Sequence, residues 1–166
     1  PIFESNKIEN SKNNLGKQKN QIRKLFQKKL NKNIKSLWVR LFYVYGKNSR
    51  KGSLIHSLKK CQLNRLKSFS LNFPYVSNDF IFIKDVVSAL ILIQKKIDDN
   101  VLINVCSNKS ISNLSFAKIF FKVKKIKIKI FYPIKSTKSI FFGSNLKLRK
   151  LGWRQKYSLN NSFKII

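Results

Sequence analysis

The sequence predicts an α/β fold built on parallel β-strands, and three features of the chain indicate it. Apolar residues recur with a 3.6-residue period between residues 16 and 31, as in an amphipathic helix. A nearly continuous apolar run follows at residues 34–44, which is typical of a strand covered on both faces of a parallel sheet. A second strand and helix follow within residues 79–96. Buried strands alternating with helices are the units of a doubly wound parallel sheet.

The remaining elements are predicted from caps, breakers and alternation. Serines placed as N-caps, turn residues around a proline, and the strictly alternating KIKIKIF segment set most of the boundaries. Gly152 is placed as the residue after a helix end, with Trp153 packing behind it. In chain order we predict a helix at 16–31, a strand at 34–44, a turn at 45–49, a short helix after Ser53, a small strand at 66–71, a loop at 72–77, a strand at 79–83, a helix at 85–96, a short strand at 101–105, a helix capped by Ser112 that ends near 123, a strand at 125–131, a short helix capped by Ser144 and a last helix from Leu159.

The charge of the chain suggests a polyanionic partner, but its composition offers another explanation. Lys and Arg total 36 against 6 Asp and Glu, a formal charge of +30, which fits a nucleic-acid-binding domain. Of those 36, however, 30 are Lys and 6 are Arg, whereas base and phosphate recognition favours the forked guanidinium. Lys, Asn, Ile and Phe are abundant while Gly, Pro and Ala are scarce, as A/T-rich codons would produce. We favour the compositional explanation and keep nucleic-acid binding as the alternative.

Cysteine and histidine usage offers no catalytic or metal-binding set. Cys61 and Cys106 lie in unlike segments, and without a secretory signal they are expected to be reduced, buried thiols of a cytoplasmic protein. His56 is the sole histidine and has no nearby carboxylate or cysteine cluster, so no metal site is predicted. No apolar run reaches the roughly 18 residues that span a bilayer. The chain contains no Met and begins at Pro1, which suggests a fragment.

Five short motifs occur in one order along nearly the whole chain. They are NNLGKQK at 13–19, RLFYVYGK at 40–47, NDFIFIKDV at 78–86, NVCSNKSIS at 104–112, and LRKLGW with YSL at 148–159. In order and content they resemble the C-terminal half of the extended short-chain dehydrogenases/reductases, which are NAD-dependent epimerases and dehydratases of nucleotide sugars. The resemblance implies a partial NAD-binding doubly wound sheet, consisting of its last helix and strands, plus a small α/β substrate-binding subdomain. Residues 1–50 would be the remnant of the first part and residues 51–166 the second.

The resemblance also implies roles for three residues. Lys19 matches a catalytic lysine that holds the nicotinamide ribose, so it is both a catalytic and a cofactor-binding candidate. Tyr43 and Asn78 are substrate-binding candidates: the first stands where the family has an Asn that contacts the sugar nucleotide, and the second where it has an Arg that pairs with the diphosphate. Leu15 stands in place of the catalytic Tyr, and leucine cannot transfer a proton.

The family's cofactor and partners follow as further expectations. NAD is the implied cofactor, with NADP as the alternative, and a nucleoside-diphosphate sugar is the implied substrate. The chain has no Gly-rich strand–turn–helix for the pyrophosphate, since its five glycines are scattered. We therefore expect an incomplete or degenerate protein that is inactive alone and requires a separate N-terminal half. The resemblance also implies a homodimer through the helix at 16–31.

The acidic residues in these motifs have a simpler structural interpretation. Asp85 is expected to cap the helix that follows it rather than to act as a catalytic acid, and Asp79 is also expected to be structural. The basic run at 122–129 is explained by a strand with one wet face. The aromatic residues lie mostly on predicted core faces rather than on a base-stacking platform.

Overall fold

The computed structural model describes residues 1–5, 14–29, 36–96 and 101–166. Its helices are α1 (Asn14–Lys29), α2 (Leu54–Leu63), α3 (Ile83–Lys96), α4 (Asn113–Val123), α5 (Leu146–Lys150) and α6 (Leu159–Ile165). Its strands are β1 (Leu37–Leu41), β2 (Tyr43–Tyr45), β3 (Ser68–Ser70), β4 (Val76–Asn78), β5 (Phe80–Phe82), β6 (Val101–Val105), β7 (Ile111–Ser112), β8 (Lys129–Phe131) and β9 (Ser139–Phe141). The predicted α/β class is confirmed.

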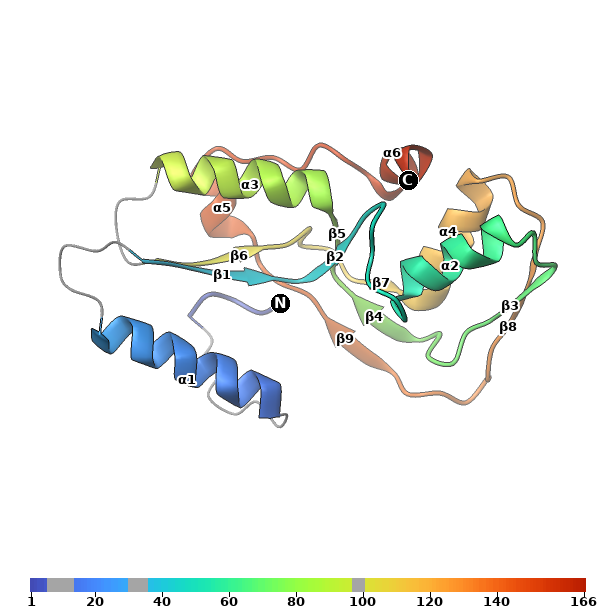
Figure 1. The fold of residues 1–166 in the computed structure, drawn as a ribbon, viewed down its shortest axis with the longest axis horizontal. Coiled ribbons are helices and arrows are strands. Elements are labelled where there is room, and N and C mark those ends of the chain that lie inside the picture. Colours follow the sequence, from blue (N-terminus) through green and yellow to red (C-terminus); the bar gives the residue numbers. More distant parts are fainter. Residues whose placement is uncertain (6–13, 30–35, 97–100) are drawn as a thin grey trace.

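One end of the molecule is a parallel strand pair between helices. β1 and β6 pair in parallel from Leu37↔Val101 to Leu41↔Val105, with α3 and α5 on one side and α1 on the other (Figure 1). Side chains from β5, α3, β6 and α5 fill the core on the α3 side, where Ile81, Ala89, Ile93, Ile103, Val105 and Leu148 are fully buried. The chain is therefore folded there like part of a helix-covered parallel sheet.

The other end is held together by aromatic packing. Helices α2, α4 and α6 enclose a cluster of rings contributed by β2, β5, α4 and α6 (Figure 1). Phe80 stacks on Phe116 with 4.0 Å between ring centroids, and Tyr45 meets Phe116 edge-on at 5.3 Å. The Tyr45 hydroxyl lies 2.6 Å from the Ser162 Oγ inside this cluster. The aromatic residues are thus used as core, as the sequence suggested.

The apolar run at 34–44 is not one strand, and that prediction was wrong in detail. β1 ends at Leu41, and Val44 N–H donates to the Phe42 carbonyl, which bends the chain tightly. After the bend β2 pairs in parallel with β5 instead of β6. The two short parallel pairs link the two ends of the molecule, because a single run of sequence belongs to both. β1 is also less covered than predicted, since Leu37 and Leu41 are exposed.

The small strands were the least predictable elements. The predicted loop at 72–77 contains the start of β4, which pairs with β7 and β9. The KIKIKIF strand is shorter than predicted: only its last three residues, β8, pair with β3. β5 is buried along its whole length rather than alternating. The Ser53 and Ser112 caps are confirmed, and so is Gly152, whose φ is +96° after α5. α5 itself starts one residue later than predicted, after Asn145 rather than Ser144.

Candidate functional site

Tyr43 begins β2 and Asn78 ends β4, and the residue that follows Asn78 contacts the Tyr43 backbone. Tyr43 N–H donates to the Asp79 carbonyl at 2.9 Å, and the Tyr43 ring packs 4.7 Å from that of Phe80. The Tyr43 hydroxyl accepts the N–H of Leu54 at the start of α2 at 3.3 Å. A hydroxyl that accepts one bond keeps its proton, so the Tyr43 hydroxyl can also donate a hydrogen bond.

Asn78 ends β4 and is held from the start of α4. Its side-chain amide donates to the Asn113 Oδ1 at 3.2 Å, and the Asn113 amide donates in turn to the Phe73 carbonyl at 3.0 Å. Asn78 is half-buried. An amide has two N–H donors and one acceptor, so this single bond leaves it capacity for another partner. It carries no charge, however, and cannot form the charge-assisted pair that an arginine makes with a phosphate.

Lys19 is separated from these two residues. It is exposed on α1, which Figure 1 places apart from β2 and β4. Leu15 lies one helical turn earlier on the same helix and is 59% exposed. The helix is confirmed over Asn14–Lys29, and its predicted end at residue 31 lies outside the described residues. The roles of Lys19, Tyr43 and Asn78 remain predictions.

Asp79 is a buried brace between three segments. Its carboxylate accepts the N–H groups of Ser107 at 2.6 Å, Asn108 at 3.0 Å and Gly143 at 3.3 Å. Burial raises the pKa of this carboxyl, and the N–H donors act in the opposite direction. The carboxylate thus ties β5 to the loop after β6 and to the chain after β9, so the structural interpretation of Asp79 is confirmed.

Asp85 was predicted to cap its own helix, and that prediction was wrong. It is the third residue of α3, and its carboxylate accepts the N–H groups of Lys156 at 2.9 Å and Tyr157 at 3.3 Å. Burial is the main cause that raises the pKa of this carboxyl. Asp85 therefore binds a segment that is distant in the sequence, and no local sequence pattern could have predicted this contact. The bond anchors the stretch that forms one wall of a cavity.

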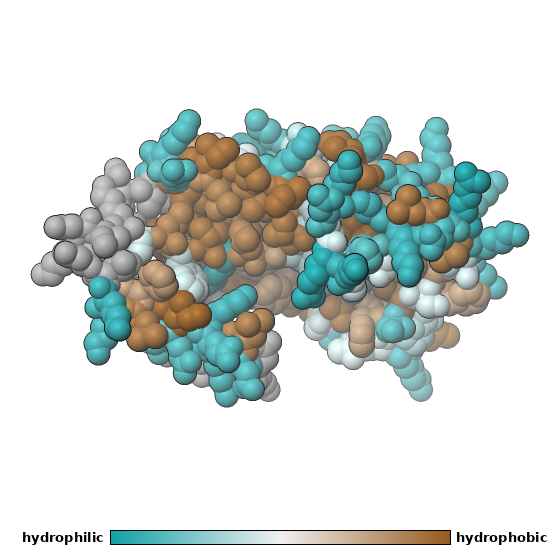
Figure 2. All heavy atoms as spheres, in the orientation of Figure 1, coloured by the Kyte–Doolittle hydropathy of each residue, from teal (hydrophilic) through white to brown (hydrophobic). Residues whose placement is uncertain are grey.

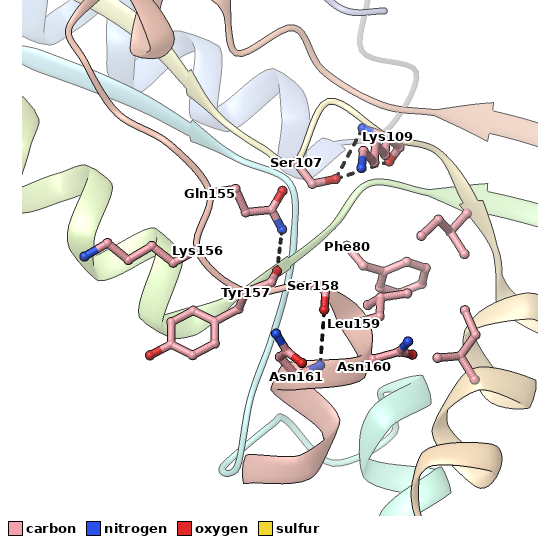
Figure 3. Close-up of a pocket in the computed structure, with 12 residues that line it drawn as sticks. Phe80, Ser107, Lys109, Gln155, Lys156, Tyr157, Ser158, Leu159, Asn160 and Asn161 are labelled. Carbon is pink, nitrogen blue, oxygen red and sulfur yellow. Dashed lines mark hydrogen bonds between the residues drawn. The ribbon is translucent and has the colours of Figure 1, made fainter.

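That cavity has a volume of about 580 Å³ and lies beside Phe80 (Figure 3). Figure 3 shows Ser107 and Lys109 on one side and the 157–161 segment on another, while the Lys156 side chain extends away. Its lining residues are Phe80, Ser107, Lys109, Ile111, Ile119, Gln155, Lys156, Tyr157, Ser158, Leu159, Asn160 and Asn161. None of them is a His, Cys, Asp or Glu, and the titratable side chains among them are Lys109, Lys156 and Tyr157.

The sequence analysis did not predict this cavity, although residues of two of the five motifs line it. Ser107, Lys109 and Ile111 belong to the 104–112 motif, and Tyr157 to Leu159 belong to the last one. Tyr43 and Asn78 do not line it. Phe80, which is 3% exposed, is shared between the cavity wall and the Tyr43 ring. The signal that could have located the cavity was the clustering of motif residues in loops rather than in helices or strands.

The cysteines and the histidine lie outside any catalytic arrangement. Both Cys61 and Cys106 are free and buried, and burial raises the pKa of each thiol. His56 borders a basic groove with Lys47, Lys51 and Lys59. Within the ranges that the structure describes, no three His, Cys, Asp or Glu side chains gather as metal ligands. None of the described helices has the length and apolar character needed to cross a bilayer.

The residues present do not fit a dinucleotide on this chain alone. Gly46 and Gly143 are required by packing, since a Cβ would lie 2.7 Å from Ile83 Cγ2 in the first case and 2.3 Å from the Phe42 ring in the second. Gly152 follows a helix end rather than beginning one. Gly46 and Gly52 both lie in the connection from β2 to α2, but they are six positions apart, so this connection has no closely spaced glycines of the G-x-G-x-x-G kind that seats a pyrophosphate.

Several solved structures of nucleotide-sugar enzymes share this fold. UDP-glucose 4-epimerase from Thermus thermophilus, solved with NAD, matches 90% of this chain with a TM-score of 0.73 and 15% identity. UDP-glucuronic acid 4-epimerase from Bacillus cereus, solved with UDP-glucuronic acid and NAD, matches 90% with a TM-score of 0.72 and 19% identity. The chain has the fold of about half of a sugar-nucleotide epimerase. TunA, an NAD-dependent NDP-hexosamine 5,6-dehydratase of tunicamycin biosynthesis, matches 76% with a TM-score of 0.62 and 22% identity.

The epimerase-like fold is partial in this chain. The matched region spans 50% of the Thermus thermophilus epimerase, 49% of the Bacillus cereus epimerase and 43% of TunA. No family model matches the sequence. No curated protein matches it either. The likeness is therefore one of fold, found at low sequence identity.

Proposed function

We propose that this chain is the sugar-nucleotide-binding portion of an NAD-dependent epimerase- or dehydratase-like protein, and that alone it binds substrate without converting it. The observation that supports the proposal is that the fold and the order of the sequence motifs agree. Nine tenths of the chain superposes on about half of two UDP-sugar epimerases, and five motifs run through that same stretch in family order.

The nucleotide end of the substrate is expected to bind around residues 43–80. Tyr43 offers a hydroxyl proton there and Asn78 a second amide N–H. A groove of about 450 Å³ lies beside β4 and is bordered by Tyr75 and Lys138, whose Nζ lies 6.0 Å from the Tyr75 ring centroid. The aromatic ring could stack on the base of a nucleotide, and the ammonium next to it could bind the phosphates. Lys138 would supply the charge that Asn78 lacks.

Catalytic inactivity of the isolated chain follows from two local features. Leu15 stands, exposed on α1, where the resemblance puts the tyrosine that exchanges a proton with the sugar. The chain also lacks the glycine-rich turn for the dinucleotide, so Lys19 has no cofactor to position unless another polypeptide supplies it. Conversion of UDP-glucose in the presence of NAD, with the nucleotide-sugar products separated by chromatography, tests this directly, because an epimerase or dehydratase returns the hydride and leaves no net NADH. Turnover by residues 1–166 alone would refute the proposal, whereas turnover only with an added N-terminal half would support it.

Two associations belong to the same proposal. The α1 helix exposes Leu15, Ile22, Leu25 and Phe26, each by 48–59%, which suits a helix that packs against a second copy of itself. Sedimentation of the chain against a Leu25→Lys, Phe26→Lys variant measures whether α1 forms such a dimer. We place the protein in the cytoplasm, because its two buried cysteines are free.

Nucleic-acid binding remains a second candidate because the formal charge is +30. It predicts that the affinity for a DNA duplex falls steeply and linearly with salt on a log–log plot. A filter-binding series from 50 to 300 mM NaCl would reveal this slope. Affinity that is weak at every salt concentration would leave the sugar-nucleotide proposal as the sole candidate.

A further inference from the structure

A groove of about 530 Å³ lies beside helix α2 and the loop that precedes it. Figure 2 shows hydrophilic side chains gathered over this end of the molecule. The residues that border the groove, which we call the α2 groove, are Lys47, Ser49, Lys51, His56, Lys59, Lys60 and Leu63. A/T-rich codons account for the number of lysines in the chain, but they do not account for four lysines around one hollow.

Hydrogen bonds hold the loop of the groove against its helix. The Lys59 ammonium on α2 donates to the Lys47 carbonyl at 2.6 Å. The Ser49 hydroxyl accepts the Gly46 N–H at 3.1 Å and donates to the Gly46 carbonyl at 2.9 Å, which closes the turn after β2. Lys59 is half-buried, and the other three lysines of the groove are exposed. The cations of the loop and of the helix are thus held close together by the fold.

No carboxylate of the described residues neutralises these cations. The described part of the chain contains Glu4, Asp79 and Asp85, and each is bound elsewhere. Glu4 accepts the N–H of Asn104, while Asp79 and Asp85 are fully buried and accept N–H groups of other segments. The α2 groove therefore keeps the whole positive charge of its lysines.

A further cation lies close to Lys59. Burial, and then the charge of Lys59, lower the pKa of the Lys124 ammonium directly after α4. Repulsion among uncompensated like charges disfavours the compact state, and an anion that contacts several of them relieves it. The positive potential of the α2 groove thus favours an anion that can meet more than one ammonium group.

We propose that the α2 groove binds a chain of phosphate groups. Lysine is a common phosphate ligand that acts as a point charge, and it lacks the planar fork with which arginine recognises a base or a carboxylate. The α2 groove therefore recognises a phosphate backbone rather than a sequence of bases. The backbone of a single-stranded nucleic acid and inorganic polyphosphate both offer this chemistry.

The α2 groove is separate from the site proposed for the sugar nucleotide. Neither Tyr43 nor Asn78 borders it. The Tyr43 hydroxyl meets α2 at the N–H of Leu54, whereas the α2 residues of the groove begin at His56. The inference therefore does not rest on the proposed function, and each can fail without the other.

The test measures the fluorescence anisotropy of a labelled 12-nucleotide oligothymidylate with residues 1–166 between 50 and 300 mM NaCl. Four lysine–phosphate contacts predict a log–log slope of affinity against salt of about −3, since each contact to a single strand contributes about −0.7. The Lys51→Gln, Lys60→Gln variant keeps the bond of Lys59 to the loop. Its slope should fall to about −1.4, and its affinity at 50 mM NaCl should fall at least tenfold.

The matched control is Lys95→Gln, Lys150→Gln, which removes the same charge from exposed positions on α3 and α5. Figure 1 places these positions apart from α2. The control should retain the slope and the affinity of the unsubstituted chain, and circular dichroism checks that both variants are folded. Equal losses in the two variants would overturn the inference, because the overall charge would then account for binding. Unchanged binding by Lys51→Gln, Lys60→Gln would overturn it as well.

Competition identifies the source of the phosphate chain. Displacement of the labelled strand by less inorganic polyphosphate than unlabelled oligothymidylate, at equal phosphate number, identifies polyphosphate as the ligand, and the reverse order identifies a nucleic acid. Displacement by UDP-glucose at a concentration that saturates Tyr43 and Asn78 would overturn the inference, because the groove would then belong to the sugar-nucleotide site. Absence of UDP-glucose binding with oligothymidylate binding intact would refute the proposed function alone.

Discussion

Replacement of Asp79 by asparagine should destabilise the whole fold, because one buried carboxylate joins three segments. Oδ1 accepts the Ser107 N–H, and Oδ2 accepts those of Asn108 and Gly143. Asparagine keeps a single acceptor oxygen and brings two donors. In its better orientation the oxygen faces Asn108 and Gly143, and the NH₂ group then opposes the Ser107 N–H.

The magnitude follows from counting these contacts. A hydrogen bond to a charged group is worth about 1.5–3 kcal/mol, and a buried donor left without a partner costs a further ~1–3 kcal/mol. Removing a buried charge offsets part of this loss, since burial disfavours the carboxylate. We expect Asp79→Asn to lower the free energy of unfolding by about 2–4 kcal/mol at pH 7, a large part of the stability of a typical domain.

Urea denaturation followed by tryptophan fluorescence measures this change, with Glu4→Gln as the matched control. Glu4 accepts one N–H, that of Asn104, and the glutamine oxygen can still accept it, so the control should lose less than about 1 kcal/mol. Equal stability of Asp79→Asn and the unsubstituted chain would refute the bracing role. So would a loss no greater than that of the control.

Three other outcomes follow from the described contacts. Tyr45→Phe should cost about 1 kcal/mol at pH 7 through loss of the bond to Ser162. Burial raises the pKa of Tyr45 to about 12 from 10, so deprotonation in the unfolded state lowers the stability of the unsubstituted chain between pH 10 and 12. Tyr45→Phe cannot ionise there, so the advantage of the unsubstituted chain in denaturation curves should shrink above pH 10 and reverse before pH 12, since each pKa unit is worth about 1.4 kcal/mol. Gly143→Ala should cost about 1–3 kcal/mol in thermal unfolding, because its Cβ would lie 2.3 Å from the Phe42 ring, and an unchanged midpoint would contradict the packing. Leu15→Tyr in residues 1–166 alone should give no conversion of UDP-glucose in the presence of NAD, because one tyrosine does not create a dinucleotide site.

Local signals in the sequence predicted local structure well. The Ser53 and Ser112 caps and the turn at Gly152 each depend on a few neighbouring residues, and all three are confirmed. The bend at Phe42 was missed because the apolar run continues through it without a break. Only the change of partner from β6 to β5 defines that bend, and pairing between distant strands leaves no local pattern.

The candidate site was also predictable only in part, because contacts between distant residues leave no local sequence pattern. The motifs indicated which stretches belong to the site, and Tyr43 does contact the residue that follows Asn78, whose carbonyl accepts the Tyr43 N–H. Their hydrogen-bond partners, Leu54 and Asn113, lie 11 and 35 residues away, and sequence spacing could not name them. Asp85 shows the limit most clearly: an acidic residue at a helix start looks like a cap, yet it binds N–H groups 71 and 72 residues further on.

The most direct test of sugar-nucleotide binding is a titration of ¹⁵N-labelled residues 1–166 with UDP-glucose, followed by amide chemical shifts at 0.3 M NaCl. Salt at this level screens the general attraction between a +30 chain and any phosphate. We predict saturable shifts that centre on Tyr43, Asn78 and the Tyr75–Lys138 groove. Shifts that do not saturate, or that inorganic pyrophosphate reproduces in full, would contradict the proposed function.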